Sequence, residues 1–274
     1  MRAVLGFVPL LAVLACRGNA MDDGTAAADP LREIPREALA RLGQKRIYFG
    51  HQSVGRNIVE GLSALAAEQP ALALRIVESR SPGALAGPAL AHARNGRNEE
   101  PLTKIRDFAE TLDAGGLGAT TDIALFKFCY VDFHPGTDVE AIFAEYRSTL
   151  AGLRRRFPAV RFVHVTAPLT VPESGPRALV KRLLGRRLLE AESNVVRDRF
   201  NALLRAEYAG REPLFDLAAA ESTGPDGRPV RFEHRGRSTP ALARGYASDG
   251  RHLNAAGSRW AAAHLLRTLA AAAE

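Results

Sequence analysis

An acid and a histidine stand three residues apart near the end of the chain, in the segment Tyr246-Ala-Ser-Asp249-Gly-Arg-His252-Leu-Asn254. This segment comes just before the apolar pattern of a final helix, so a carboxylate in a loop can orient an imidazole on the next turn. A carboxylate that orients a histidine is the acid and base half of a hydrolytic triad. The spacing therefore indicates general-base chemistry by His252, oriented by Asp249.

A candidate nucleophile lies early in the chain, where a strand pattern turns into a helix pattern in Ile47-Tyr-Phe-Gly-His-Gln-Ser53-Val-Gly55. A hydroxyl on the first turn of a helix lies among unpaired N–H groups at the positive end of the helix dipole, which can stabilise a developing oxyanion. Serine is also a common N-cap, and this is the alternative role for Ser53. Taken with Asp249 and His252, the position predicts that Ser53 is the nucleophile of a Ser-His-Asp triad.

Strand-like and helix-like segments alternate between these two motifs. We expect strands near residues 46–50, 72–78, 122–130, 160–166 and 213–217, and helices near 30–43, 54–68, 101–112, 138–157, 188–209 and 254–272. The strands are apolar nearly throughout, as is usual when both faces of a sheet are covered. The alternation predicts an α/β fold, a three-layer α/β/α sandwich around a mainly parallel, roughly five-stranded sheet.

Two stretches interrupt this alternation, residues 168–187 and residues 221–247. Both are predicted to be long loops at the carboxyl edge of the sheet, where open α/β folds bind their ligands. The intervening helix carries Asn194, Arg197 and Asn201 at helical spacing, which we interpret as a solvated or inter-helix polar face.

The first sixteen residues place one arginine ahead of a short apolar run, which is typical of a secretory signal. Val13-Leu-Ala-Cys16 is similar to a bacterial lipoprotein box and would leave Cys16 lipidated, whereas cleavage after Ala20 is the alternative. We therefore expect a signal peptide over 1–20, a tether over 21–29 and a single domain over 30–274. The expected location is the periplasm or the outer membrane of a bacterium.

The formal net charge of +7 comes mainly from arginine, with clusters at 154–156 and 177–187. These clusters have no interleaved aromatic residues and match no nucleic-acid motif, so we expect no nucleic-acid partner. Solvated helix faces explain them most simply, and contact with an anionic glycan or membrane surface is the alternative. We otherwise expect membrane contact only through an N-terminal lipid anchor. No recognised zinc spacing is present, so we expect no metal and no cofactor.

A serine after the first strand and Asp-x-x-His before the last helix resemble the SGNH/GDSL hydrolase superfamily. The sequence is most similar to bacterial members with a Gly-His-x-Ser-Val-Gly turn, and the resemblance covers residues 45–272. It implies Ser53 as nucleophile, His252 as base and Asp249 as acid. It also implies that the backbone N–H groups of Ser53 and Gly96 form an oxyanion hole.

The chain departs from this superfamily in the third motif, where Gly-x-Asn-Asp is replaced by Cys129-Tyr-Val-Asp132. Valine takes the place of the oxyanion asparagine, and we expect Asn98 in the neighbouring loop to substitute for it. His51 and Asp132 are expected to contact substrate. The alternatives are a bond from His51 to a neighbouring loop and a structural hydrogen-bonding role for Asp132.

These observations predict an exported serine esterase that hydrolyses acyl esters of small molecules or of envelope glycans through an acyl-enzyme. One alternative is a glycan O-acyltransferase that uses the same acyl-enzyme. The other is a glycan-binding domain that has lost catalysis, which the valine at the oxyanion position favours.

Overall fold

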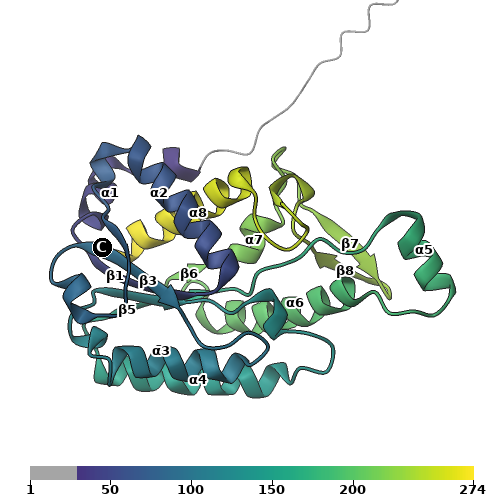
Figure 1. Cartoon of the computed structure of the whole chain (residues 1–274), viewed down its shortest axis with the longest axis horizontal. Helices are drawn as coiled ribbons and strands as arrows, with labels where there is room; N and C mark the ends of the chain where they lie inside the picture. Colours follow the sequence, from purple (N-terminus) through teal and green to yellow (C-terminus); the bar gives the residue numbers. More distant parts are fainter. Residues whose placement is uncertain (1–29) are drawn as a thin grey trace, which may run out of the picture.

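The computed structural model describes residues 30–274, except for the side chains of residues 177 and 182 (Figure 1). The expected signal over 1–20, with its lipidation site at Cys16, and the expected tether over 21–29 lie outside the described residues.

Six parallel strands form the central sheet in the order β2-β3-β1-β4-β5-β6. Their bounds are β1 Arg46–His51, β2 Ile76–Glu78, β3 Ala89–Arg94, β4 Ile123–Phe126, β5 Arg161–Val165 and β6 Leu214–Phe215. The central strand β1 pairs with β3 on one side and with β4 on the other. The predicted α/β class and its parallel sheet are therefore confirmed.

The sheet has one strand more than expected, because β3 was not predicted. Its sequence is Ala89-Leu-Ala-His-Ala-Arg94, and alanine has a low strand propensity. The segment forms a strand because it pairs with β1 and β2 at once and its side chains from Ala89 to Ala93 are buried. Tertiary pairing thus overrides the local preference.

Helices cover both faces of the sheet (Figure 1). Along β1 the side chains alternate, with Ile47 and Phe49 in the core beneath one helical layer and Tyr48 in the core beneath the other. The first layer contains α1 (Arg36–Leu42), α2 (Ser53–Glu68), α7 (Leu217–Glu221) and α8 (Ala255–Ala272), and the second contains α3 (Pro101–Leu112), α4 (Val139–Arg156) and α6 (Leu189–Tyr208). Short 3-10 turns lie at Pro30–Glu33, Pro70–Leu72, Pro82–Leu85, Leu117–Ala119, Tyr130–Asp132 and Arg244–Tyr246.

Both stretches predicted as loops contain regular structure. Helix α5 (Gly175–Leu183) lies within the first. Strands β7 (Arg231–His234) and β8 (Arg237–Pro240) form an antiparallel hairpin within the second. Figure 1 shows α5 and the hairpin side by side at one end of the molecule, beyond the sheet.

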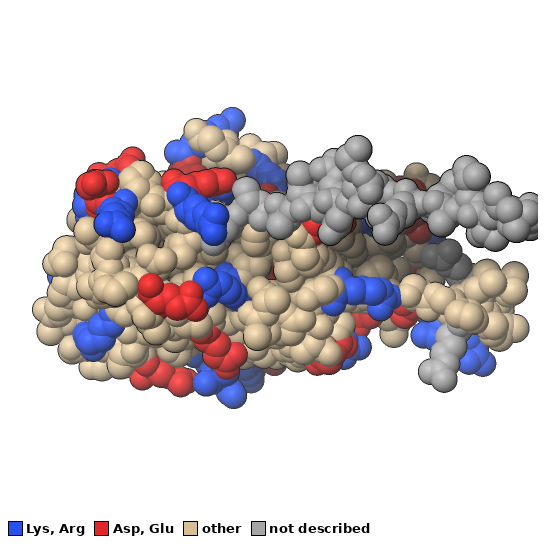
Figure 2. Space-filling model, turned by 90° about the horizontal axis from the view of Figure 1, so that it is seen from above, with Lys and Arg blue, Asp and Glu red and all other residues tan. Residues whose placement is uncertain are grey.

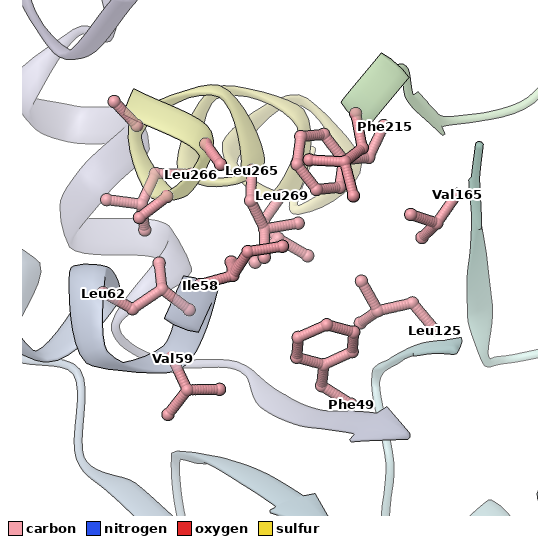
Figure 3. Packing of buried hydrophobic residues seen from close by; sticks show 14 of the residues in the cluster. Phe49, Ile58, Val59, Leu62, Leu125, Val165, Phe215, Leu265, Leu266 and Leu269 are labelled. Carbon is pink, nitrogen blue, oxygen red and sulfur yellow. The ribbon is translucent and has the colours of Figure 1, made fainter. Parts of the chain in front are cut away.

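Helices α2 and α8 pack closely against each other over the sheet. Gly61 of α2 lies against the backbone of α8, where a Cβ atom would collide with the carbonyl oxygen of Ser258 and lie 2.9 Å from the Cβ of Ala262. Figure 3 shows Ile58 and Leu62 of α2 meeting Leu265, Leu266 and Leu269 of α8. On the sheet side of them lie Phe49, Leu125 and Val165 of the strands β1, β4 and β5. Glycine at position 61 therefore sets how closely the two helices approach.

We predict that Gly61→Ala lowers the free energy of unfolding by about 1–3 kcal/mol, because the added methyl group overpacks this contact. Helix propensity alone would change stability in the opposite direction. The matched control is Gly152→Ala in α4, where the nearest atom to a new Cβ is 4.0 Å away. That variant should gain about 0.5–1 kcal/mol. Urea denaturation measures both, and stabilisation of both variants would contradict the packing argument.

Candidate active site

Ser53 is the first residue of α2 and follows the central strand β1 after only one intervening residue, Gln52. The Gln52 side chain is tied to the end of β3, because its Nε2 donates to the carbonyl oxygens of Asn95 at 3.0 Å and Gly96 at 2.8 Å. Within residues 30–274 no side chain caps α2. The Ser53 side chain therefore emerges at the carboxyl edge of the sheet, beside the open N-terminus of a helix.

His252 lies in the loop that leads into α8. Asn254 caps α8 by accepting a hydrogen bond from the backbone N–H of Gly257 at 2.9 Å, and its own N–H donates to the carbonyl of Tyr246 at 2.9 Å. Asp249 accepts backbone N–H groups from Arg251 and His252, both at 2.8 Å. These bonds close the loop upon itself and fix the acid beside the histidine.

The three residues form one continuous hydrogen-bonded chain. His252 Nδ1 lies 2.8 Å from Asp249 Oδ2, and His252 Nε2 lies 3.0 Å from Ser53 Oγ. Hydrogen bonds from the side chain and the backbone of His252 hold the pKa of Asp249 below its usual range. An ionised Asp249 accepts a hydrogen bond from His252 Nδ1–H, and this tautomer leaves the Nε2 lone pair free to accept the proton of Ser53. The arrangement can thus deliver an activated hydroxyl at the sheet edge.

Tyr130 forms part of the site and was not predicted as a site residue. Its ring meets the His252 ring edge-on, with the centroids 5.6 Å apart, and its carbonyl accepts a 2.8 Å bond from Arg197 Nε. Burial raises the pKa of Tyr130, so its hydroxyl keeps its proton. The sequence feature that could have identified Tyr130 as a site residue is its place in the third motif, directly before Val131.

The segment before α5 is held by the polar face of α6. The side-chain amide of Asn201 bonds both backbone groups of Ala167, and that of Asn194 bonds both backbone groups of Thr170. Arg197 Nη1 lies 2.7 Å from Thr170 Oγ1. The three α6 residues are buried, so the inter-helix or solvated face expected from sequence is instead a clamp on the chain after β5.

The prediction that His51 contacts substrate is wrong. His51 ends β1 with its side chain turned inward, where only 1% of the residue is exposed. Its ring nitrogens lie 2.8 Å from the Gln52 carbonyl oxygen and 3.0 Å from His92 Nδ1. Burial lowers the pKa of His51 to about 3, so the ring is neutral. The pair of histidines joins β1 to β3 beneath the site.

The prediction that Asp132 contacts substrate is also wrong, and its alternative structural role fits. The two Asp132 oxygens lie 2.6 and 2.7 Å from Lys104 Nζ, and both residues are fully buried. The carboxylate also accepts the backbone N–H groups of Glu99 at 3.0 Å and Cys129 at 2.6 Å. Asp132 therefore ties the loop after β3 to the turn after β4, and a buried carboxylate with all these partners has no place for a ligand.

The Gly96 N–H does not point into the site as predicted. It donates to Asp107 Oδ2 at 2.7 Å, and so it is already paired. Asn98 is exposed in the same loop, and its Oδ1 accepts a 3.1 Å bond from Lys104 Nζ. No described residue accepts a hydrogen bond from Asn98 Nδ2, so this amide is available as a donor.

Among residues 30–274, no three His, Cys, Asp or Glu side chains gather in a way that could hold a metal ion. No helix in this range combines the length and apolar character needed to cross a membrane.

No protein-family model matches the sequence, and no curated protein matches it. Solved structures share the fold. A protein described as a GDSL-like lipase, from Parabacteroides merdae, superposes with a TM-score of 0.50 and 14% identity over 85% of this chain and 99% of its own. A lipase/acylhydrolase from Enterococcus faecalis gives a TM-score of 0.46 and 14% identity over 83% and 96%. The α/β fold that the sequence predicts is therefore confirmed, and the chain shares it with this GDSL-like lipase.

The buried pair predicts a large and specific effect on stability. Asp132→Ala should lower the free energy of unfolding by about 3–5 kcal/mol, because the buried Lys104 loses its counter-ion. Adding Lys104→Met should recover part of the loss, since no unpaired charge then remains. The control is Glu100→Ala, which removes the exposed pair with Arg97 and should cost about 0–1 kcal/mol. Urea denaturation of the four proteins decides this, and equal losses in the first and last variants would contradict the structural role of Asp132.

Proposed function

We propose that the protein is a serine ester hydrolase of the SGNH type. The observation that carries the proposal is the hydrogen-bonded chain from Asp249 through His252 to Ser53 at the carboxyl edge of the sheet. A hydroxyl, a histidine and an acid in this order form an arrangement that recurs on unrelated folds and is recognised by its geometry. The shared fold with a GDSL-like lipase is compatible with this chemistry.

The reaction follows from the positions of the atoms. His252 Nε2 takes the proton of Ser53 Oγ while the oxygen attacks the ester carbonyl, and the resulting imidazolium gives that proton to the departing alcohol. Ionised Asp249 holds the ring in the right tautomer and stabilises the imidazolium. Water, deprotonated by the same histidine, then hydrolyses the acyl-enzyme. The mechanism requires no cofactor.

Two donors are proposed for the developing oxyanion. The first is the backbone N–H of Ser53, at the uncapped start of α2. The second is the Asn98 side-chain amide, because Gly96 N–H is paired and the Val131 side chain has no donor. The bond from Lys104 to Asn98 Oδ1 fixes the orientation of the amide, and Gln52 ties its loop next to Ser53. A side-chain donor from the loop after β3 thus replaces the missing asparagine.

The substrate class is an acyl ester on a small molecule or on an envelope or extracellular glycan. The signal-like residues 1–16 support export, which would bring the enzyme to such esters. An acyltransferase would differ only in the acceptor, so product analysis with a glycan present separates hydrolysis from transfer.

We predict that Ser53→Ala lowers turnover of short-chain aryl esters by about 10⁴- to 10⁶-fold, because the covalent route is lost. The thermal midpoint should hardly change, since Ser53 makes no capping bond and alanine favours helices. Ser63→Ala, on the exposed side of the same helix, should keep full activity. A fluorophosphonate probe should label Ser53 in the parent, as mass spectrometry would show. A folded Ser53→Ala variant with most of its activity would sink the mechanism, and a parent that neither reacts nor turns over would favour the binding-domain alternative.

Asn98→Asp tests the second donor, because the new carboxylate keeps an oxygen for Lys104 but replaces the amide N–H groups by a negative charge that repels an oxyanion. We expect turnover to fall by about 10²- to 10³-fold. The Michaelis constant should change little, since the donor acts mainly on the transition state. The thermal midpoint serves as the control and should stay near that of the parent. Unchanged turnover would mean that another group binds the oxyanion.

A further inference from the structure

Helix α5 and the residues after it carry an apolar face that is turned to solvent. Five of the six strongly exposed large apolar side chains in residues 30–274 belong to this segment, namely Leu179 (57% exposed), Val180 (52%), Leu183 (78%), Leu184 (64%) and Leu189 (55%). Such side chains occur singly on most surfaces, whereas a cluster marks a site of interaction. This exposed cluster therefore indicates a surface that binds another molecule.

Packing of the opposite side of α5 fixes the direction of this face. Ala178 is buried against Leu188 and Ala191, with Phe232 of β7 beside them. We call α5 and the adjoining β7–β8 hairpin the α5 lobe. At about 100° per residue, positions 179, 180, 183 and 184 span one arc centred roughly opposite position 178. The helix is thus held by its alanine side and presents its leucines outward, the reverse of an ordinary surface helix.

The border of the apolar face is cationic. Residues 175–187 contain five Lys or Arg and no Asp or Glu. Lys181, Arg186 and Arg187 are exposed there, and the neighbouring hairpin adds Arg235 and Arg237. Three acids, Glu173, Glu192 and Asp198, pair with four of these cations, and the excess of Lys and Arg leaves the border with a net positive charge. Figure 2 shows uncharged surface with Lys or Arg at its border on the right-hand lobe, where Figure 1 places α5. An aliphatic face with a cationic rim is typical of helices that lie in the interface of an anionic bilayer.

Both ends of α5 are joined to the loop that carries the acid and the histidine. Before the helix, the Val171 N–H donates to the Gly250 carbonyl at 2.8 Å, and Arg244 bonds Ser174 Oγ at 2.5 Å. After the helix, Glu190 pairs with Arg251 at 2.7 Å. The apolar face is therefore anchored at the rim of the site.

We propose that α5 and Leu184 dock on an anionic phospholipid surface, and that the site then acts on acyl esters presented at that surface. The second part rests on the proposed function. Charge complementarity favours lipid over a second copy of this equally cationic chain, whose rim would repel its twin. Five aliphatic side chains are also far fewer than the about 20–30 residues a side of a stable protein interface, and no aromatic anchor lies among them.

Docking is tested by fluorescence on the full-length chain. Cys16→Ser leaves the buried Cys129 as the natural cysteine, and Leu183→Cys then accepts an environment-sensitive dye on the apolar face. The matched control is Ala67→Cys, exposed near the far end of α2. We expect a blue shift at position 183 with phosphatidylglycerol-containing vesicles, little with pure phosphatidylcholine and none at position 67. No shift at position 183, or equal shifts at both positions, overturns the proposal.

Activity provides the second arm. Leu183→Asp with Leu184→Asp should lower hydrolysis of an ester embedded in phosphatidylglycerol vesicles by at least about 10-fold. Hydrolysis of a soluble aryl ester should be unchanged. The control Leu102→Asp changes an exposed leucine elsewhere and should lower neither rate. An equal loss of activity on both substrates overturns the proposal. So does sedimentation analysis in which the parent is a dimer and the double variant is a monomer. A parent inactive on both substrates defeats the proposed function alone, because the fluorescence still judges docking.

Discussion

The contact between α2 and α8 is the constraint on which the candidate site depends. Ser53 opens the first helix and His252 stands three residues before the second, so 199 positions of sequence separate two atoms that lie 3.0 Å apart. Both helices begin at the same edge of the sheet, and Gly61 lets their backbones approach closely. A small change in the spacing of the helices would be felt directly as a change in the distance between nucleophile and base.

Around this contact, buried polar groups hold the connecting loops. Lys104 and Asp132 fix the loop after β3 to the turn after β4, and the amides of Asn194 and Asn201 clamp the chain after β5. Burying such groups costs free energy unless every partner is present, and these groups are paired. This cost in free energy is compatible with loops that must hold one geometry around the site. Directional hydrogen bonds fix the position of a loop more closely than apolar contacts do.

The acid and the base themselves lie near the surface, with 55% of the Asp249 side chain exposed. Hydrogen bonds from His252 and Arg251, and not burial, therefore lower the pKa of this carboxyl and favour its ionised form. This exposure is compatible with the proposed esters on a glycan or at a lipid surface. If α5 docks on lipid as proposed, its apolar face would bring such an ester to the site.

Local sequence determined what depends on near neighbours. The three-residue spacing of Asp249 and His252 dictates their contact, and the apolar periodicity placed α3 at 101–112, its observed bounds. Only the tertiary structure decided which way His51 points, which partner takes the Gly96 N–H, and that alanine-rich β3 is a strand. In each case the partner belongs to another element. His92 of β3 bonds His51, Asp107 of α3 accepts the Gly96 N–H, and β1 and β2 pair with β3. A sequence specifies donors, acceptors and apolar faces, but their pairing over long separations is fixed only when the layers come together.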